Sequence, residues 1–230
     1  TTEALVKAMA EAGADLIELG IPFSDPTAEG PVIQAANLRA LKAGTTTDKV
    51  FELVRKLRET ITIPMVFMTY ANVVFSYGSK KFLSRAAEAG IQGLILPDVP
   101  FEEKAEFEPL CAKYGLELVS MIAPTSHERI RSIAAEAKGF VYCVSSLGVT
   151  GVRSSITTDI GAMVKLVKET KAIPAAVGFG ISTPEQAREM AQKADGVIVG
   201  SAIVKLIAAN GRDSVEPVTE YVKAMKDAIR

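Results

Sequence analysis

The chain has 230 residues, which is long enough for one large domain with a substantial core or for two small domains. Its 26 Lys and Arg residues and 27 Asp and Glu residues leave a net charge of −1, so composition gives no electrostatic argument for a nucleic-acid partner or an anionic membrane. Mean hydropathy is high at +0.23, yet no apolar run approaches the roughly 20 residues of a membrane span. The apolar surroundings of both cysteines fit a reducing, cytoplasmic compartment.

Short runs rich in Val, Ile and Leu alternate with helical patterns along the whole chain. Their continuous apolar character, without strict alternation, is typical of parallel strands buried on both faces. The predicted strands are residues 15–20, 64–69, 93–97, 117–122, 140–145, 174–179 and 196–200. The predicted helices are residues 2–12, 31–42, 47–59, 101–114, 127–137, 157–170 and 183–193.

Regular βα alternation predicts an α/β fold, either a (β/α) barrel or an open doubly wound sheet. The absence of a G-x-G-x-x-G motif after the first strand weakens the dinucleotide-binding form of the open sheet. Seven strands are predicted, and the first element is a helix with no strand before it. The simplest interpretation is a TIM-type (β/α)8 barrel that lacks its first strand. We expect one barrel domain over residues 1–230, shortened at its N-terminus.

The segment DLIELGIPFSDP, residues 15–26, places Glu18 between two large apolar residues of the first predicted strand. Burying a carboxylate is costly, and desolvation raises its pKa. Glu18 also lies near the C-terminal end of its strand, where barrel enzymes build their active sites. These features favour a catalytic role over a structural pairing with Arg or Lys. In the loop that follows, Glu29 either points back over the barrel mouth or is an ordinary solvated charge.

Glycine clusters follow two late strands, in the motifs VGFGIS (177–182) and VGSAIV (199–204). If the first strand is missing, these strands are the seventh and eighth of the barrel. The loops after those strands commonly bind phosphate through backbone N–H groups and a helix N-terminus. The loop SSLGVTGVRSS (145–155) is rich in small residues and predicts either a mobile lid or a merely flexible connection.

His127 is the only histidine, and it lies at a predicted helix start. Metal-dependent enzymes of this architecture usually need several histidines, so we expect no metal site. No predicted strand contains a Lys, which disfavours a Schiff-base aldolase. The chemistry that remains is acid–base catalysis by carboxyl and phenol groups on a phosphorylated substrate, without a cofactor.

Seven motifs then occur in order: ELGIPFSDPTAEGPVIQ, YANVVF, LPDVPFEE, APTS, GFVYCVSSLGVTGVR, VGFGIS and DGVIVGSAIV. With them, essentially the whole chain resembles the tryptophan synthase alpha subunit family. The family's chain begins with a further helix and strand, which accounts for the missing first strand. The resemblance implies a lyase of tryptophan biosynthesis that cleaves indole-3-glycerol phosphate to indole and glyceraldehyde 3-phosphate. It also implies a pyridoxal-phosphate beta subunit as partner in an alpha2beta2 complex.

The resemblance also implies residue roles. Glu18 matches the general acid/base, Glu29 matches the acceptor of the indole N–H where the family most often has Asp, and Tyr142 matches the residue that orients the reacting hydroxyl. The residues implied to bind phosphate through backbone groups are Gly151, Gly180, Gly200 and Ser201, with Thr150 helping the lid to close. The residues implied to surround the partner contact are Pro22, Asp25, Asn72, Asp98 and Pro100.

Two alternative functions stay open. The chain is either another sugar-phosphate barrel, such as an isomerase with paired carboxylates, or a non-catalytic or weakly active subunit that only activates its beta partner. The missing first strand supports the second alternative, as does Ser146, which stands where the family often has Arg.

Overall fold

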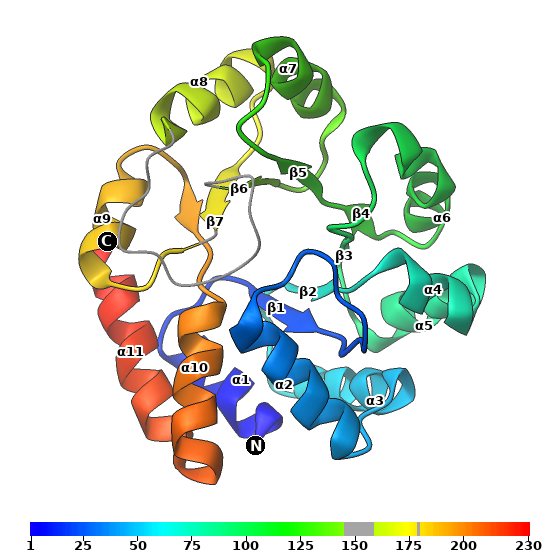
Figure 1. Ribbon diagram of the computed structural model, residues 1–230, viewed down its shortest axis with the longest axis vertical. Helices are drawn as coiled ribbons and strands as arrows, with labels where there is room; N and C mark the ends of the chain where they lie inside the picture. The colour runs from blue at the N-terminus through cyan, green and yellow to red at the C-terminus, as the bar shows by residue number, and fades with distance from the viewer. Residues whose placement is uncertain (145–158, 179) are drawn as a thin grey trace.

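The computed structural model describes residues 1–144, 159–178 and 180–230, with the strands gathered at the centre and the helices around them (Figure 1). The strands are β1 (Ile17–Gly20), β2 (Met65–Met68), β3 (Gly93–Ile95), β4 (Glu117–Leu118), β5 (Ser120–Ile122), β6 (Val141–Val144), β7 (Ala175–Gly178) and β8 (Gly196–Val197). Every ladder is parallel, in the orders β1-β2-β3-β4 and β5-β6-β7-β8. The fold is a TIM-type barrel, as predicted.

The predicted strand at 117–122 is divided at Val119. Its first part, β4, pairs with β3, and its second part, β5, pairs with β6, so one stretch of chain joins the two groups of strands. Val119 itself still donates its N–H to the carbonyl of Leu94 at 2.9 Å. The eight labelled strands therefore occupy the seven predicted strand positions. Within the described ranges, no ladder joins β8 to β1.

The α-helices are α1 (Thr2–Glu11), α2 (Pro31–Lys42), α3 (Thr47–Arg58), α4 (Ala71–Tyr77), α5 (Ser79–Ala89), α6 (Glu108–Lys113), α7 (His127–Glu136), α8 (Ile160–Thr170), α9 (Pro184–Ala191), α10 (Ser201–Asn210) and α11 (Val215–Ala228). Two short 3-10 helices are η1 (Phe101–Glu106) and η2 (Gly211–Asp213). The predicted helix 101–114 is therefore two elements, η1 and α6, separated at the buried Phe107. No predicted helix range covers α4, α5, α10 or α11, although the motif VGSAIV indicates the helix start at α10. None of the described helices combines the length and apolar character that a bilayer crossing requires.

Side-chain caps and apolar stripes explain why the predicted helices form where they do. At the start of α3, the Thr46 side chain accepts a hydrogen bond from the Lys49 N–H at 3.3 Å. The same helix then buries an apolar stripe at helical spacing, made of Val50, Phe51, Val54 and Leu57. Capping and periodicity thus agree along α3, and the stripe faces the strands.

Strand residues alternate between the helix layer and the barrel interior. Ile17 and Leu19 of β1 pack in a cluster with apolar residues of α3 and α5. A separate cluster of strand residues fills the interior: Val66, Ile95, Val119, Tyr142 and Val144. Glu18 lies opposite Val66 in the β1–β2 ladder, so its side chain is on the interior face. The fold therefore directs Glu18 into the barrel, toward Tyr142.

Candidate active site

Glu18 occupies the interior face of β1, two residues before the strand ends. Its side chain is partly buried. Burial raises the pKa of Glu18 to about 7, and the negative charge of Glu29 adds to the rise. A carboxyl group with this pKa is present in both protonation states at neutral pH, which general acid–base catalysis requires.

Tyr142 lies on β6, 5 % exposed, and its phenol faces the interior. Burial raises the pKa of Tyr142 well above its ordinary value, and the negative charge of Glu18 raises it further. The phenol therefore stays protonated beside the Glu18 carboxyl. Gly178 of β7 makes room for it, because a Cβ built on Gly178 would lie 2.6 Å from the Tyr142 hydroxyl oxygen. Such a contact is far shorter than any normal packing distance.

Glu29 lies in the loop that follows β1, close enough for its charge to act on Glu18. The Nδ2 of Asn37, on α2, donates a hydrogen bond to the carboxylate of Glu29 at 2.6 Å, and the Tyr70 hydroxyl forms a second hydrogen bond with Glu29. Burial raises the pKa of Glu29, while these two hydrogen bonds oppose the rise. Glu29 is therefore a partly buried, hydrogen-bonded carboxyl group and not a freely solvated charge.

Tyr70 is a site residue that sequence reasoning missed. It directly precedes α4, is 2 % exposed, and its hydroxyl accepts a hydrogen bond from the Ala28 N–H at 3.2 Å. Its ring lies against Phe23, with 5.3 Å between centroids. Burial raises the pKa of Tyr70 to about 12, so it remains a donor toward Glu29. The available signal was a Tyr immediately after a buried strand, in the motif YANVVF.

Three of the four predicted phosphate residues, Gly180, Gly200 and Ser201, lie after β7 and β8, which are neighbours in the sheet. Gly180 follows β7 and has φ +93°, a conformation that favours glycine. Gly200 and Ser201 form the start of α10, and a Cβ built on Gly200 would meet nothing within 4 Å. The predicted lid and phosphate residues Thr150 and Gly151 lie outside the described residues, as does Ser146.

The predicted partner residues follow three adjacent strands, β1, β2 and β3, so they share one end of the barrel. Pro22 is partly exposed, whereas Asp25, Asn72, Asp98 and Pro100 are exposed. Asp98 joins two of these segments, because its carboxylate accepts the N–H of Ala71 at 3.1 Å at the start of α4.

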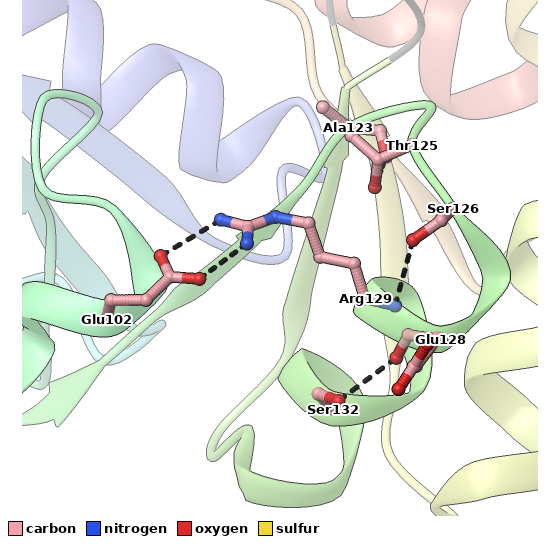
Figure 2. A network of polar contacts seen from close by, with 7 residues as sticks. All are labelled: Glu102, Ala123, Thr125, Ser126, Glu128, Arg129 and Ser132. Atoms are coloured by element: carbon pink, nitrogen blue, oxygen red, sulfur yellow. Dashed lines mark hydrogen bonds and ion pairs between the residues drawn. The ribbon is translucent and has the colours of Figure 1, made fainter.

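An ion pair on the same end of the molecule ties η1 to α7. Figure 2 shows the guanidinium of Arg129 bridging both carboxylate oxygens of Glu102, at 2.5 and 3.1 Å. The Arg129 N–H is held in turn by the Ser126 side chain, which caps α7 at 3.3 Å. The Arg129 and Glu102 side chains are 40 % and 57 % exposed, so solvent screening limits what the pair adds to stability.

No group of three or more His, Cys, Asp and Glu residues in the described part of the chain is arranged to hold a metal ion. Cys111 and Cys143 are buried free thiols, and burial raises the pKa of each to about 12. The described site brings together two interacting carboxyl groups and the phenols beside them.

A parallel barrel with paired carboxyl groups and a phenol at its mouth defines a TIM-barrel acid–base enzyme. Comparison with known proteins is more specific, since the family model described as tryptophan synthase alpha chain matches residues 1–230. The chain belongs to the tryptophan synthase alpha chain family.

Relatives and solved structures agree with this membership. The chain is 50% identical to the tryptophan synthase alpha chain of Lactiplantibacillus plantarum, covering 97% of this chain and 85% of that protein. It is 47% identical to that of Lacticaseibacillus casei, over 100% of this chain and 86% of the relative. The alpha subunit structure from Legionella pneumophila superposes with TM-score 0.88 at 38% identity, covering 99% and 86% of the two chains. A chain of the Pyrococcus furiosus tryptophan synthase complex superposes with TM-score 0.89 at 35% identity, and the match covers 98% of this chain and 91% of that chain.

Proposed function

We propose that this chain is a lyase of tryptophan biosynthesis that cleaves indole-3-glycerol phosphate to indole and glyceraldehyde 3-phosphate. One observation carries the proposal: Glu18 points into the barrel with a pKa raised to about 7, next to Tyr142 and Glu29. Membership of the tryptophan synthase alpha chain family supports the same reaction.

The reaction is a retro-aldol cleavage in which Glu18 gives one proton and takes one. The acid form of Glu18 protonates C3 of the indole ring, which turns the ring into an electron acceptor. The resulting carboxylate then removes the proton of the hydroxyl group on the side-chain carbon attached to C3. The bond between these carbons breaks, its electron pair restores the aromatic indole, and the hydroxyl-bearing carbon becomes an aldehyde. Because the proton count balances, Glu18 ends in its starting state.

The other site residues hold the substrate. Glu29 accepts the indole N–H and stabilises the positive charge that develops on the protonated ring, while Tyr142 orients the reacting hydroxyl against Glu18. Backbone groups bind the phosphate at Gly151, Gly180, Gly200 and Ser201, and Thr150 helps to close the lid. Two phosphate loops that follow adjacent strands suit one phosphate group between them.

The proposal includes the tryptophan synthase beta subunit as a partner in an alpha2beta2 complex, contacting the surface formed by Pro22, Asp25, Asn72, Asp98 and Pro100. The Pyrococcus furiosus neighbour is a tryptophan synthase complex, and another solved structure of that enzyme concerns mutual activation of its a2b2 complex. We assign the chain to the cytoplasm, as a single barrel domain over residues 1–230 that needs no cofactor of its own.

The decisive experiment measures indole release from indole-3-glycerol phosphate by the full chain, with and without beta subunit. Glu18→Gln keeps the size of the side chain and removes its proton chemistry, so we expect the rate to fall by about 100-fold or more. Glu106→Gln, at an exposed carboxylate of η1, is the matched control and should keep its activity. Unchanged cleavage by Glu18→Gln would refute the mechanism. A wild-type chain that stimulates the beta subunit without any cleavage would favour the non-catalytic alternative.

A further inference from the structure

The C-terminal helix α11 contacts the segment that joins β7 to α9, in the region where Figure 1 shows α11 beside α9. Tyr221 of α11 donates its hydroxyl to the carbonyl of Ser182 at 2.9 Å. Its ring packs against two apolar clusters, one in the barrel wall and one between α11, α10 and α1. Burial raises the pKa of Tyr221 to about 12, so the hydroxyl keeps its proton at neutral pH.

Ser182 is also held from the opposite side, by α9. The Oε1 of Gln186 accepts the N–H of Ser182 at 2.8 Å and the N–H of Thr183 at 3.2 Å. The Thr183 side chain accepts the N–H of Gln186 at 3.3 Å, which completes a capping box at the start of α9. The N–H of Ser182 is thus fixed by α9 and its carbonyl by α11.

Gly180 precedes this anchored residue by two positions. A glycine at φ +93° has no side chain to restrain it, so its peptide groups take their direction from the residues that flank it. Earlier in the chain, β7 ends at Gly178 and is paired in the sheet. After Gly180, Ile181 is buried in an apolar cluster, and Ser182 is held at its N–H by α9. The contact from α11 adds a second restraint, at the carbonyl of Ser182.

We propose that Tyr221 is a positioning residue of the phosphate site, which fixes the backbone after β7 so that the donors at Gly180 are preorganised for the phosphate of the substrate. This inference rests on the proposed function, because it assumes that Gly180 binds phosphate. Preorganised donors need no rearrangement on binding, so a loosened loop weakens phosphate binding. The chemistry at Glu18, on the strand β1, does not depend on the contact.

The test uses Tyr221→Phe, which keeps the ring and removes the hydroxyl. In the full chain with beta subunit, we expect KM for indole-3-glycerol phosphate to rise about 3- to 10-fold and kcat to change less than about twofold. Inhibition by inorganic phosphate should weaken by the same factor. Tyr77→Phe, on α4, is the matched control, because it removes a hydroxyl that donates to Asp48 of α3 at 2.6 Å, away from this loop. It should leave both phosphate readouts unchanged.

Each outcome decides the inference. An unchanged KM and unchanged phosphate inhibition in Tyr221→Phe would overturn it, while wild-type cleavage would leave the proposed function standing. Equal losses in Tyr221→Phe and Tyr77→Phe, with equal drops in thermal unfolding temperature, would indicate a general structural effect and also overturn it. If the wild-type chain neither cleaves the substrate nor responds to phosphate, the proposed function itself fails.

Discussion

Glu18 should cost the folded protein stability, and this cost can be measured with Glu18→Gln. In the folded chain, burial and the charge of Glu29 raise the pKa of Glu18 from its ordinary 4.5 to about 7. One pKa unit corresponds to about 1.4 kcal/mol, so the ionised carboxylate destabilises the folded state by up to about 3 kcal/mol. An amide at this position cannot ionise and avoids that cost. Partial solvent access to the side chain lowers the expected gain to about 1–3 kcal/mol.

The sign of the effect with pH follows from proton binding. Between 4.5 and about 7, the folded chain keeps the Glu18 proton while the unfolded chain releases it. The folded state therefore binds more protons, and the contribution of Glu18 to stability falls as pH rises through this window. At about pH 5 the difference between wild type and Glu18→Gln should be below about 1 kcal/mol. At about pH 8 it should reach its full value, in favour of the variant.

Urea unfolding at these two pH values measures the free energy of unfolding of both proteins. Glu106→Gln, at an exposed carboxylate, is the control and should stay within about 0.5 kcal/mol of wild type at both pH values. The reasoning would be refuted if Glu18→Gln were less stable than wild type at the higher pH. It would also be refuted by a stability difference that does not change with pH. A variant that is more stable and inactive would show that the carboxyl is retained for chemistry.

Three further substitutions test the surroundings. Gly178→Ala should destabilise the protein by about 1–3 kcal/mol and lower kcat at least about tenfold, because the new Cβ collides with Tyr142. Unchanged kinetics and an unchanged free energy of unfolding would contradict this packing argument. Tyr70→Phe removes a hydrogen bond to Glu29 and should lower kcat/KM about 3- to 10-fold in steady-state assays, and an unchanged value would show that Glu29 is held without it. Thr69→Val should stabilise the protein by about 1 kcal/mol in thermal unfolding without loss of activity, because the buried Thr69 hydroxyl has no hydrogen-bond partner among the described residues. A less stable variant would show that the Thr69 hydroxyl does have a partner.

The barrel strands could be predicted from sequence because a strand buried on both faces has a local signature. The bounds of α2 could be predicted as well, since Pro31 begins the helix and its end precedes Gly44 at φ +76°. The helix α4 could not be predicted from the sequence. Its sequence, ANVVFSY, is rich in β-branched and aromatic residues, and the group that accepts its first N–H is Asp98, which is 27 positions away. The helix α10 has a largely apolar sequence, SAIVKLIAAN, yet none of its residues is fully buried, so only its start after the glycine could be predicted.

The candidate site was predictable in part for the same reason. The apolar neighbours of Glu18 within one strand mark it as a candidate site residue from the sequence alone. No local pattern marks the partners of Glu29, because Asn37 lies on a separate helix and Tyr70 contacts Ala28, which is 42 positions away in the sequence. The need for Gly178 arises from the ring of Tyr142 on the neighbouring strand, which no local pattern reveals.

The two carboxyl groups differ in what touches them, and this difference supports the roles proposed for them. Glu29 receives hydrogen bonds from Asn37 and Tyr70, which favour its ionised form and oppose the effect of burial. Glu18 has no such donor within the described ranges, and burial and the charge of Glu29 both keep its proton on. The two carboxyl groups of one site are therefore tuned differently: hydrogen bonds oppose the rise in pKa at Glu29, whereas burial and a neighbouring charge raise the pKa of Glu18 to about 7. Under the proposed mechanism, the hydrogen-bonded carboxyl suits the indole N–H and the ring charge, and the carboxyl that titrates near neutral pH suits proton transfer.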